Sequence, residues 1–403
     1  MAEWISKTLG EITSFITKGI PPKYVEEENK NTVRVLNQKC NKNFEISYDE
    51  SRLHNAVLRK ISEEKLLRYG DVLINSTGTG TAGRVAQIFN VPVPTTIDGH
   101  MILLRHIDQI DSIYYGYAVK GQQNKIESLA EGSTGQTEIN RQRLKDEIII
   151  TFPKEKMLQK AIGKLLFQID EKIRNNKQIN NNLEQQAQAI FKSWFVDFEP
   201  FNGEMPHDWI ASRLGDIASI KTNSFSPVKN PDAQLEHYSI PAYDEQKYPV
   251  FESAAGVKSN KYILSKNSVM ISKLNPDTKR VWRPMCLSEL AVSSTEFIIF
   301  EAFNPAYRDF VFSIIDSVAF SDWMCAHTTG STNSRQRTAP SATLEFQVAL
   351  PDEKVITDFC AIVTPMYDTI AANICENQKL AQLRDSILPK LMSGELDVTD
   401  IDL

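Results

Sequence analysis

The chain has 403 residues, 41% hydrophobic and 24% charged, which predicts a globular protein of two or three domains. No stretch approaches the roughly 18 to 20 uninterrupted apolar residues of a membrane helix, and the charged residues near the N-terminus argue against a signal peptide. The net charge of −6 argues at first against a nucleic-acid partner. The five cysteines are scattered and form no Cys-x-x-Cys pair, which disfavours zinc and is typical of a reduced, cytoplasmic protein.

The first recognisable pattern is Trp-Ile-x-x-x-Leu-Gly-x-Ile at residues 4–12. Residues 13–131 follow, and their many Gly, Pro, Asn and Ser residues predict mixed strands and short helices joined by turns. The tripeptide Gly-Ser-Thr at 132–134 closes this segment, and a proline follows at 153. We therefore expect a folded α/β domain in this part of the chain.

A literal Gly-x-Gly-x-x-Gly motif lies at residues 78–83, after the strand-like segment 71–76. A dinucleotide site would require a helix to begin there, so that its N-terminal amides face the pyrophosphate. Only residues 84–90 separate the motif from two nearby prolines, and this segment is more typical of a second strand. We interpret the motif as a turn between strands with Arg84 at its exit. Such a loop can approach a DNA groove, although most loops of this kind are simply turns.

A long helix is predicted over residues 157–195, and it would span about 58 Å at 1.5 Å per residue. Its apolar residues follow two seven-residue tracks, as in the paired seam of a coiled coil. The tracks are Ile162, Ile169, Leu183 and Ile190 on one side, and Leu158, Leu165 and Ile179 on the other. Asn176, Lys172 and Gln186 lie on or beside the seam. Such polar residues either set the helix register or, as we prefer, mark places where the seam opens to solvent.

The second half of the chain repeats these landmarks in the same order. Trp-Ile-x-x-x-Leu-Gly-x-Ile returns at 209–217, Gly-Ser-Thr at 330–332 and Pro-x-Glu-Lys at 351–354, with offsets of 205, 198 and 198 residues. A second helical pattern follows, with tracks Cys360, Tyr367, Ile374, Ala381 and Leu388 beside Ile356, Val363 and Ile370. Because each long amphipathic helix needs a partner, we expect the two to pair. Residues 218–329 differ from 13–131, so two similar frames hold two different inserts. This pattern is typical of a protein that recognises two different targets at a fixed separation.

Residues 256–283 carry seven basic residues against one acid, Asp277. Within this segment Asn275-Pro276-Asp277 is a turn signal. Lys and Arg on a turn can contact phosphates, and Asn or Arg can read base edges. The alternative is an exposed hairpin with solvated charges and Trp282 in the core. We favour DNA contact, because the cluster is dense on an otherwise acidic chain.

Motifs of catalysis are missing from the sequence. The nearest match to the Asn/Asp-Pro-Pro-aromatic tetrad of adenine methyltransferases, at 275–278, lacks the second proline and the aromatic ring. The sequence contains no Gly-x-x-x-x-Gly-Lys-Ser/Thr phosphate loop, no His-Glu-x-x-His motif and no serine elbow. Its six histidines show no metal-ligand spacing. We therefore expect no catalytic site, metal site or cofactor in this chain.

Residues 70–80 with 83–85, and residues 271–282, resemble the target-recognition domains of type I restriction–modification specificity subunits. Residues 189–201 and 383–396, which close the two helices, are similar to the helical spacers of that family. The resemblance covers essentially the whole chain. It implies an α+β protein, in which two α/β target-recognition domains are separated by two long helices that form an antiparallel coiled coil with a pseudo-twofold internal repeat.

The resemblance also implies an organisation into four parts. These are target-recognition domain 1 at 1–152, a central helical spacer and linker at 153–208, target-recognition domain 2 at 209–350, and a distal helical spacer and tail at 351–403. Each recognition domain would read one half of a bipartite site in double-stranded DNA. Two methyltransferase (modification) subunits and two restriction/translocase subunits would join the chain, and those partners would bind S-adenosylmethionine, ATP and Mg.

Candidate DNA contacts lie in loops of both halves. In the first half they are Thr77, Thr79, Arg84, Ser133, Thr134, Gln136 and Arg141. In the second half they are Lys273, Asn275, Lys279, Arg280, Arg283, Ser331, Thr332 and Arg335. The second Gly-Ser-Thr loop departs from the first after its third residue, so the two loops need not do the same job. Two other functions stay open: a coiled-coil scaffold that does not bind DNA, and a standalone DNA-binding repressor.

Overall fold

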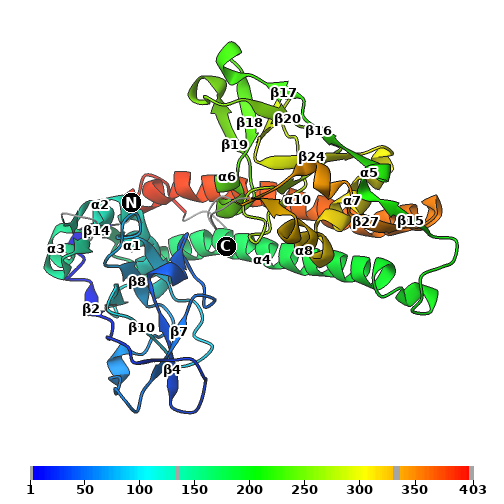
Figure 1. The fold of residues 1–403 in the computed structure, drawn as a ribbon. Coiled ribbons are helices and arrows are strands. Elements are labelled where there is room, and N and C mark those ends of the chain that lie inside the picture. The colour runs from blue at the N-terminus through cyan, green and yellow to red at the C-terminus, as the bar shows by residue number, and fades with distance from the viewer. Residues whose placement is uncertain (1–2, 133–136, 330–335, 399–403) are drawn as a thin grey trace. The chain divides into compact units, whose positions relative to one another are not determined.

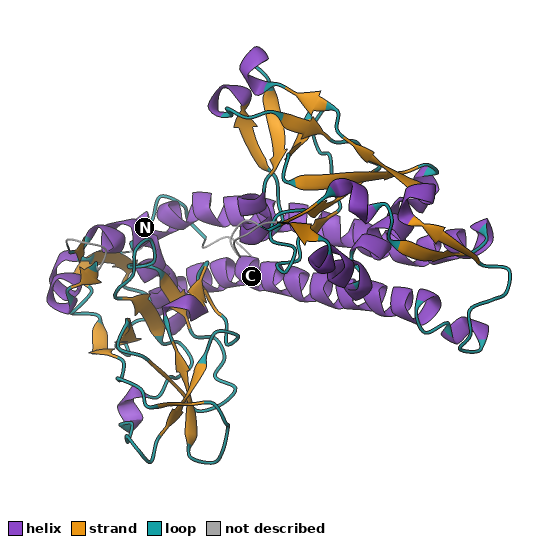
Figure 2. Cartoon of the chain, viewed as in Figure 1, coloured by secondary structure: helices purple, strands orange, loops and turns teal. Residues whose placement is uncertain are grey.

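The computed structural model describes residues 3–132, 137–329 and 336–398. Its contacts divide the chain into two compact units. The first unit comprises Met1–Lys172 and Lys379–Leu403, and the second unit comprises Ile173–Gln378. Two long helices, α4 (Lys156–Phe195) and α10 (Glu353–Ser393), contribute to both units (Figure 1). Strands and helices are mixed within each unit, as predicted (Figure 2).

The first unit contains two four-stranded sheets. An antiparallel sheet has the order β2 (Thr13–Lys18), β11 (Met101–His106), β8 (Val72–Asn75) and β9 (Val85–Gln87). The other has the order β10 (Thr95–Ile97), β4 (Thr32–Leu36), β7 (Arg52–Asn55) and β3 (Tyr24–Val25), with β10 and β4 parallel. The paired strands are β1 (Trp4–Thr8) with β14 (Ile149–Pro153), β5 (Asn41–Lys42) with β6 (Glu45–Ile46), and β12 (Ala130–Glu131) with β13 (Glu138–Ile139). The short helices are α1 (Ser112–Gly121), α2 (Gln123–Ser128) and α3 (Arg141–Glu147).

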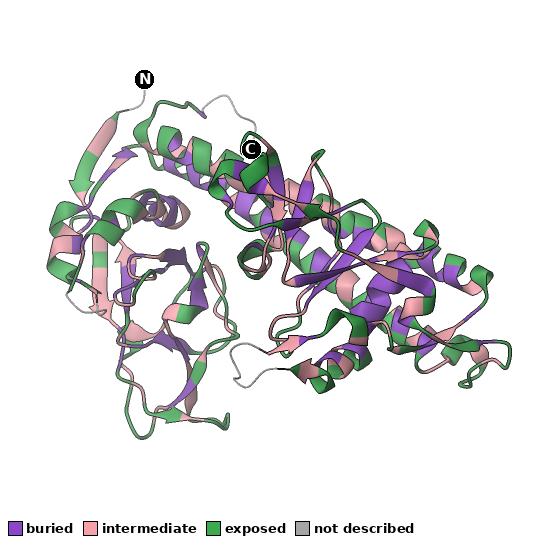
Figure 3. Cartoon of the chain, turned by 45° about the horizontal axis from the view of Figure 1, so that its top comes forward, coloured by how far each residue is buried: buried purple, intermediate pink, exposed green. Residues whose placement is uncertain are grey.

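Helix α1 supplies the largest side chains of this unit's core. It begins after Asp111, whose carboxylate accepts hydrogen bonds from the backbone amides of Ile113 and Tyr114, as a helix N-cap should. Three tyrosines of α1, Tyr114, Tyr115 and Tyr117, are fully buried. They pack in one apolar cluster with β8, β11 and the parts of α4 and α10 that belong to this unit. Figure 3 shows these strands mainly in the colour of buried residues.

The second unit also contains two sheets. An antiparallel sheet has the order β16 (Ala218–Lys221), β24 (Phe297–Ala302), β21 (Ser268–Ser272) and β22 (Val281–Trp282). A five-stranded sheet has the order β17 (Ser224–Phe225), β20 (Lys261–Ile263), β23 (Ala291–Ser294), β18 (Gln234–Tyr238) and β19 (Val250–Ser253). The paired strands are β15 (Ile210–Arg213) with β27 (Gln347–Leu350), and β25 (Thr328–Thr329) with β26 (Arg337–Thr338). The helices are α5 (Leu214–Ile217), α6 (Ile240–Gln246), α7 (Arg308–Ile315), α8 (Val318–Ala326) and α9 (Pro340–Thr343).

The antiparallel four-stranded sheets of the two units share one topology. In each, the strands appear in the spatial order first, fourth, second, third of their sequence order. In each unit, too, the repeated Trp-Ile frame forms a strand that pairs with the strand just before a long helix, β1 with β14 and β15 with β27. The expected turn at Gly78–Gly83 is confirmed: strand β9 follows it, and no helix begins there.

The segments of α4 and α10 within the second unit pack against each other in antiparallel directions. Asn180 of α4 bonds Asn373 of α10, and the earlier residue Asn176 bonds the later residue Asn377. The preferred interpretation of Asn176 was wrong, because this residue is only 1% exposed and its amide is hydrogen-bonded. The position of Ile179 on the seam was also wrong, because its side chain is 45% exposed.

Helix α10 is the described helix whose length and apolar composition would suffice to cross a membrane, although the sequence held no uninterrupted apolar run. Its residues Phe359, Val363 and Tyr367 are buried in the apolar cluster of the second unit. Packing within the second unit therefore covers part of the apolar face of this helix.

Candidate nucleic-acid interface

Each unit brings together two loops that are about sixty residues apart in sequence. We call residues 76–84 with 130–132 and 137–139 the first loop pair, and residues 272–281 with 328–329 and 336–338 the second loop pair. In the first, Thr77 forms an antiparallel bridge with Glu138, and the Ile139 amide donates to the Ser76 carbonyl at 2.8 Å. In the second, Leu274 forms the equivalent bridge with Arg337. Of the nine predicted DNA-contact residues that the structure describes, seven lie in these two loop pairs.

Glycines shape the first loop. Gly78, Gly80 and Gly83 all adopt positive φ angles, of 106°, 71° and 90°. A Cβ atom at Gly83 would come within 2.9 Å of the Glu127 backbone nitrogen, so a larger residue does not fit there. These three positions form a tight loop, and they leave no helix N-terminus for a dinucleotide.

The predicted contact residues of this loop differ in their surroundings. Thr77 Oγ1 lies 2.9 Å from His100 Nδ1, within hydrogen-bond distance. Arg84 folds back, and its Nη2 donates to the Gly80 carbonyl at 3.0 Å. Thr79 is exposed at the tip of the loop. Of these side chains, Thr79 is therefore the one most accessible to an incoming ligand.

Arg141 is the first residue of α3 and lies beside two lysines that the sequence analysis missed. Burial lowers the pKa of Lys65, and the positive charge of Arg141 lowers this pKa further. The pKa of Lys18 is lowered by the same two causes in the same order. Lys65 Nζ donates to the Lys18 carbonyl at 2.9 Å, and Lys18 also forms an ion pair with Glu138. We call Lys18, Lys65 and Arg141 the cation cluster.

The cation cluster adjoins a hollow of about 640 Å³ lined by Lys18, Glu138, Arg141 and Lys145, among others. The lining also holds a second carboxylate, Glu131, which pairs with Arg143, so positive charges still exceed negative ones. This excess favours a bound anion such as a phosphate. No local sequence pattern could have revealed Lys18 and Lys65, because strand pairing and an intervening loop bring them to Arg141.

In the second loop pair, Asn275 begins a turn in which the Thr278 amide donates to the Asn275 carbonyl at 2.9 Å. Asn275 has a φ of 49°, and its side-chain oxygen is buried without a hydrogen-bond partner in the described structure. The partner loop is fixed by Arg337, whose guanidinium donates to both oxygens of Glu296 at 3.0 Å. These hydrogen bonds lower the pKa of Glu296, which burial opposes. Lys273 has no ion-pair partner among the described residues.

The other three predicted cations of this hairpin are bound to carboxylates. Lys279 Nζ lies 2.7 Å from Asp316 Oδ1. Arg280 donates to both oxygens of Asp244, at 2.6 and 2.9 Å. Arg283 also forms ion pairs with two aspartates, and its side chain is 10% exposed. Their surroundings thus differ from those expected of groups that contact DNA phosphates.

The remaining predicted contacts, Ser133, Thr134, Gln136, Ser331, Thr332 and Arg335, lie outside the described residues. The strands on either side of them, β12–β13 and β25–β26, are described and belong to the two loop pairs.

Two of the cysteines, Cys286 and Cys360, are poor nucleophiles. Burial raises the pKa of Cys286 to about 12 and that of Cys360 to about 11, so both thiols stay protonated at neutral pH. No group of three or more His, Cys, Asp or Glu side chains suited to a metal ion occurs in the described parts of the chain.

Residues 1–185 match the family model of the type I restriction modification DNA specificity domain. The chain is 23% identical to the type I restriction enzyme MjaIX specificity subunit of Methanocaldococcus jannaschii, over 99% of this chain and 95% of that protein. It is 21% identical to the HindI specificity subunit of Haemophilus influenzae, over 60% of this chain and 68% of that protein. A crystal structure of the type I restriction–modification S subunit from M. genitalium has the same fold, with a TM-score of 0.62, 18% identity and coverage of 99% of this chain and 97% of that one. Residues 1–185 thus match a type I specificity domain, and nearly the whole chain is similar in sequence and fold to type I restriction–modification specificity subunits.

Proposed function

We propose that this chain is the DNA-sequence specificity subunit of a type I restriction–modification enzyme and that each unit reads one half of a bipartite DNA site. The observation that carries the proposal is the loop pair, which recurs in both units after the same strand of the same sheet topology. The loops themselves differ in sequence, with Gly-Thr-Gly in one and Asn-Pro-Asp in the other. A shared frame with different loops suits two readers with different half-sites.

The cation cluster supplies the sequence-independent part of binding in this proposal. Phosphate contacts position a protein on the duplex, whereas side chains that reach the base edges determine the sequence read. Lys18, Lys65 and Arg141 are suited to the first task. The neighbouring loop, with Thr79 exposed at its tip, is suited to the second.

The long helices are the spacer in this proposal. We infer an antiparallel coiled coil over the full lengths of α4 and α10, with recognition domains at 1–152 and 209–350 and helical spacers at 153–208 and 351–403. Contacts within each unit support this inference. Asn180 and Asn373 bond in the second unit, and Asp170 of α4 pairs with Arg384 of α10 in the first.

We further propose that the chain has no catalytic site and acts in the cytoplasm with two modification subunits and two restriction/translocase subunits. S-adenosylmethionine, ATP and Mg would then be bound by those partners. This assignment follows from the missing catalytic motifs of the sequence. Adenine methylation by the highly purified chain without partners would contradict it.

The test is to sequence the host genome by a long-read method that detects methylated adenine, and then to measure binding of the complex to the motif found. A specificity subunit predicts a bipartite motif and an affinity that falls steeply with salt, with a logarithmic slope of about −0.9 per phosphate contact. A scaffold predicts no salt-dependent, sequence-selective binding. A standalone repressor predicts that the chain alone binds as tightly as the complex.

A further inference from the structure

The hairpin that carries the 275–278 turn is fastened to three helices of the second unit by ion pairs. Lys279 binds Asp316, the C-cap residue of α7. Arg280 binds Asp244 of α6 through two hydrogen bonds. Both cations therefore have a carboxylate partner outside the hairpin.

Arg283 joins two of these helices at once. It donates to both carboxylate oxygens of Asp309 on α7, at 2.7 and 3.1 Å, and to Asp368 on α10 at 2.8 Å. Asp309 is nearly fully buried, with 4% of its side chain exposed, and Thr364 of α10 donates to it as well. Arg308 also donates to both oxygens of Asp309, at 3.1 and 3.2 Å, so Arg283 belongs to a buried network of charges on these two helices.

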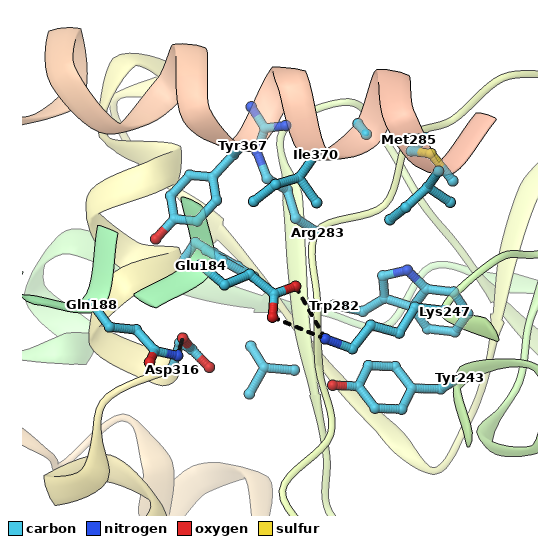
Figure 4. Close-up of a pocket in the computed structure, with 14 residues that line it drawn as sticks. Glu184, Gln188, Tyr243, Lys247, Trp282, Arg283, Met285, Asp316, Tyr367 and Ile370 are labelled. Atoms are coloured by element: carbon cyan, nitrogen blue, oxygen red, sulfur yellow. Dashed lines mark hydrogen bonds and ion pairs between the residues drawn. The ribbon is translucent and has the colours of Figure 1, made fainter. Parts of the chain in front are cut away.

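Apolar packing does not fill the space beneath the hairpin. A cavity of about 90 Å³ lies there, lined by Glu184, Tyr243, Lys247, Trp282, Asp316 and Tyr367, among others (Figure 4). Lys247 spans it and donates to both oxygens of Glu184 at 3.1 and 3.2 Å. Gln188 of α4 donates to Asp316 at 2.7 Å, so the partner of Lys279 is itself bonded to the long helix. Polar contacts therefore fix how this hairpin lies on the helices.

We propose that Lys279, Arg280 and Arg283 are positioning residues that hold the 275–278 turn in its reading position and do not contact DNA phosphates. This inference rests on the proposed function of the second unit as a DNA reader. A guanidinium bound through two parallel hydrogen bonds fixes direction as well as distance, because its planar fork matches the carboxylate. Lys273, on the other side of the turn, is left as the cation of this hairpin that can meet a phosphate.

The test exchanges the charges of one pair in the assembled complex with its modification subunits. Arg280→Asp should lower the ratio of specific to non-specific DNA affinity by about tenfold, and Asp244→Arg in the same chain should restore most of that ratio. The logarithmic salt slope should stay unchanged in both variants. If Arg280 contacts a phosphate, its loss instead lowers the slope by about 0.9, and Asp244→Arg does not restore specificity.

A conservative variant keeps the proposal testable even where Arg280→Asp fails to fold. Arg280→Lys retains the charge and loses the paired hydrogen bonds, so we expect a degenerate second half-site in the methylated motif and an unchanged first half-site. The proposal is overturned if the methylated motif of this variant keeps its full base specificity at both half-sites. The matched control is the exposed pair Arg213–Glu345 of the same unit, whose exchange should alter neither the motif nor the slope. If the unmodified complex itself lacks salt-dependent, sequence-selective binding, the proposed function fails, rather than the positioning role alone.

Discussion

Asn176 and Asn377 hydrogen-bond to each other between α4 and α10 of the second unit, with 2.9 Å between Nδ2 and Oδ1. The same Nδ2 donates to Glu376 Oε2 at 2.6 Å, and Asn176 is 1% exposed. Sliding one helix by a heptad would set Asn176 opposite Ile370, where its amide would have no partner. The contact therefore favours one register of this antiparallel pair, as buried asparagines do in coiled coils.

Replacing Asn176 with alanine should destabilise the protein by about 1–3 kcal/mol, because two half-buried acceptors on α10, in Glu376 and Asn377, lose their donor. Denaturant unfolding of the chain measures this change. Asn182 is exposed on the same helix, and Asn182→Ala is the control, with an expected effect within about 0.5 kcal/mol. Equal effects at the two positions would mean that the buried contact does not stabilise the helix pair.

In the first unit, we expect the loss of a buried ion pair to destabilise the protein strongly. Asp170 accepts hydrogen bonds from the Tyr117 hydroxyl at 2.6 Å and from Arg384 Nη1 at 2.5 Å. We expect Asp170→Asn to cost about 3 kcal/mol, at the lower end for a broken buried pair, because Arg384 keeps Asp385 as a partner. Asp385→Asn should cost less than about 1 kcal/mol, because the Asp385 side chain is 63% exposed. Thermal unfolding of the two variants tests this order, and the reverse order would contradict it.

His237 predicts a loss of stability on acidification. Burial lowers the pKa of His237 below its ordinary value, and the hydrogen bond that His237 makes to the Glu252 carboxylate opposes this shift only in part. Below about pH 6.5 the unfolded chain therefore binds a proton that the folded chain binds less readily, so stability falls as the pH decreases through that range. We expect His237→Gln to flatten the dependence of unfolding free energy on pH between about 7 and 5. An unchanged slope in that window would show that His237 does not titrate as its burial requires.

The cation cluster predicts how salt acts on DNA binding. Lys65→Ala and Arg141→Ala should each weaken binding to all sequences alike and reduce the logarithmic salt slope by about 0.9. Lys154→Ala is the matched control, because Lys154 is an exposed lysine of the same unit that pairs with Glu3. Titration of labelled duplexes at several salt concentrations distinguishes the variants. A slope that matches the control in both variants would remove the cluster from the interface.

The sequence allowed prediction of features that depend on local patterns. Turn residues and strand lengths showed that Gly78–Gly83 is a loop, and heptad spacing located α4 and α10. The charged residues of the hairpin could be identified from the sequence, but the carboxylates that pair with them could not. Asp244, Asp309 and Asp368 lie 36, 26 and 85 residues from the cations that they bind, and only the tertiary fold brings them together. Lys18 and Lys65 could not be predicted as site residues for the same reason.

The two long helices carry the last prediction, which concerns the distance between half-sites. Residues 180–182 are three consecutive asparagines, a polar stretch of α4 that would be expected to tolerate an insertion, but Asn180 is buried and bonded to Asn373. An insertion must therefore lengthen both helices between the same two contacts, after Lys177 in α4 and after Cys375 in α10. Asn176 then keeps Asn377, and Asn180 keeps Asn373.

If the helices form a rod that separates the two readers, the inserted length should appear in the recognised DNA. Four residues in each helix add about 6 Å, and DNA rises about 3.4 Å per base pair. The unspecified gap of the methylated motif should therefore grow by one or two base pairs while both half-sites stay the same. Four residues also turn the seam away from its partner, whereas seven preserve it, so a seven-residue insertion of about 10 Å should give a more stable complex and a gap longer by about three base pairs. Lengthening α4 alone is the control and should impair folding, because it separates Asn180 from Asn373 or Asn176 from Asn377. A motif with altered half-sites at unchanged spacing would show that the helices do not set the distance.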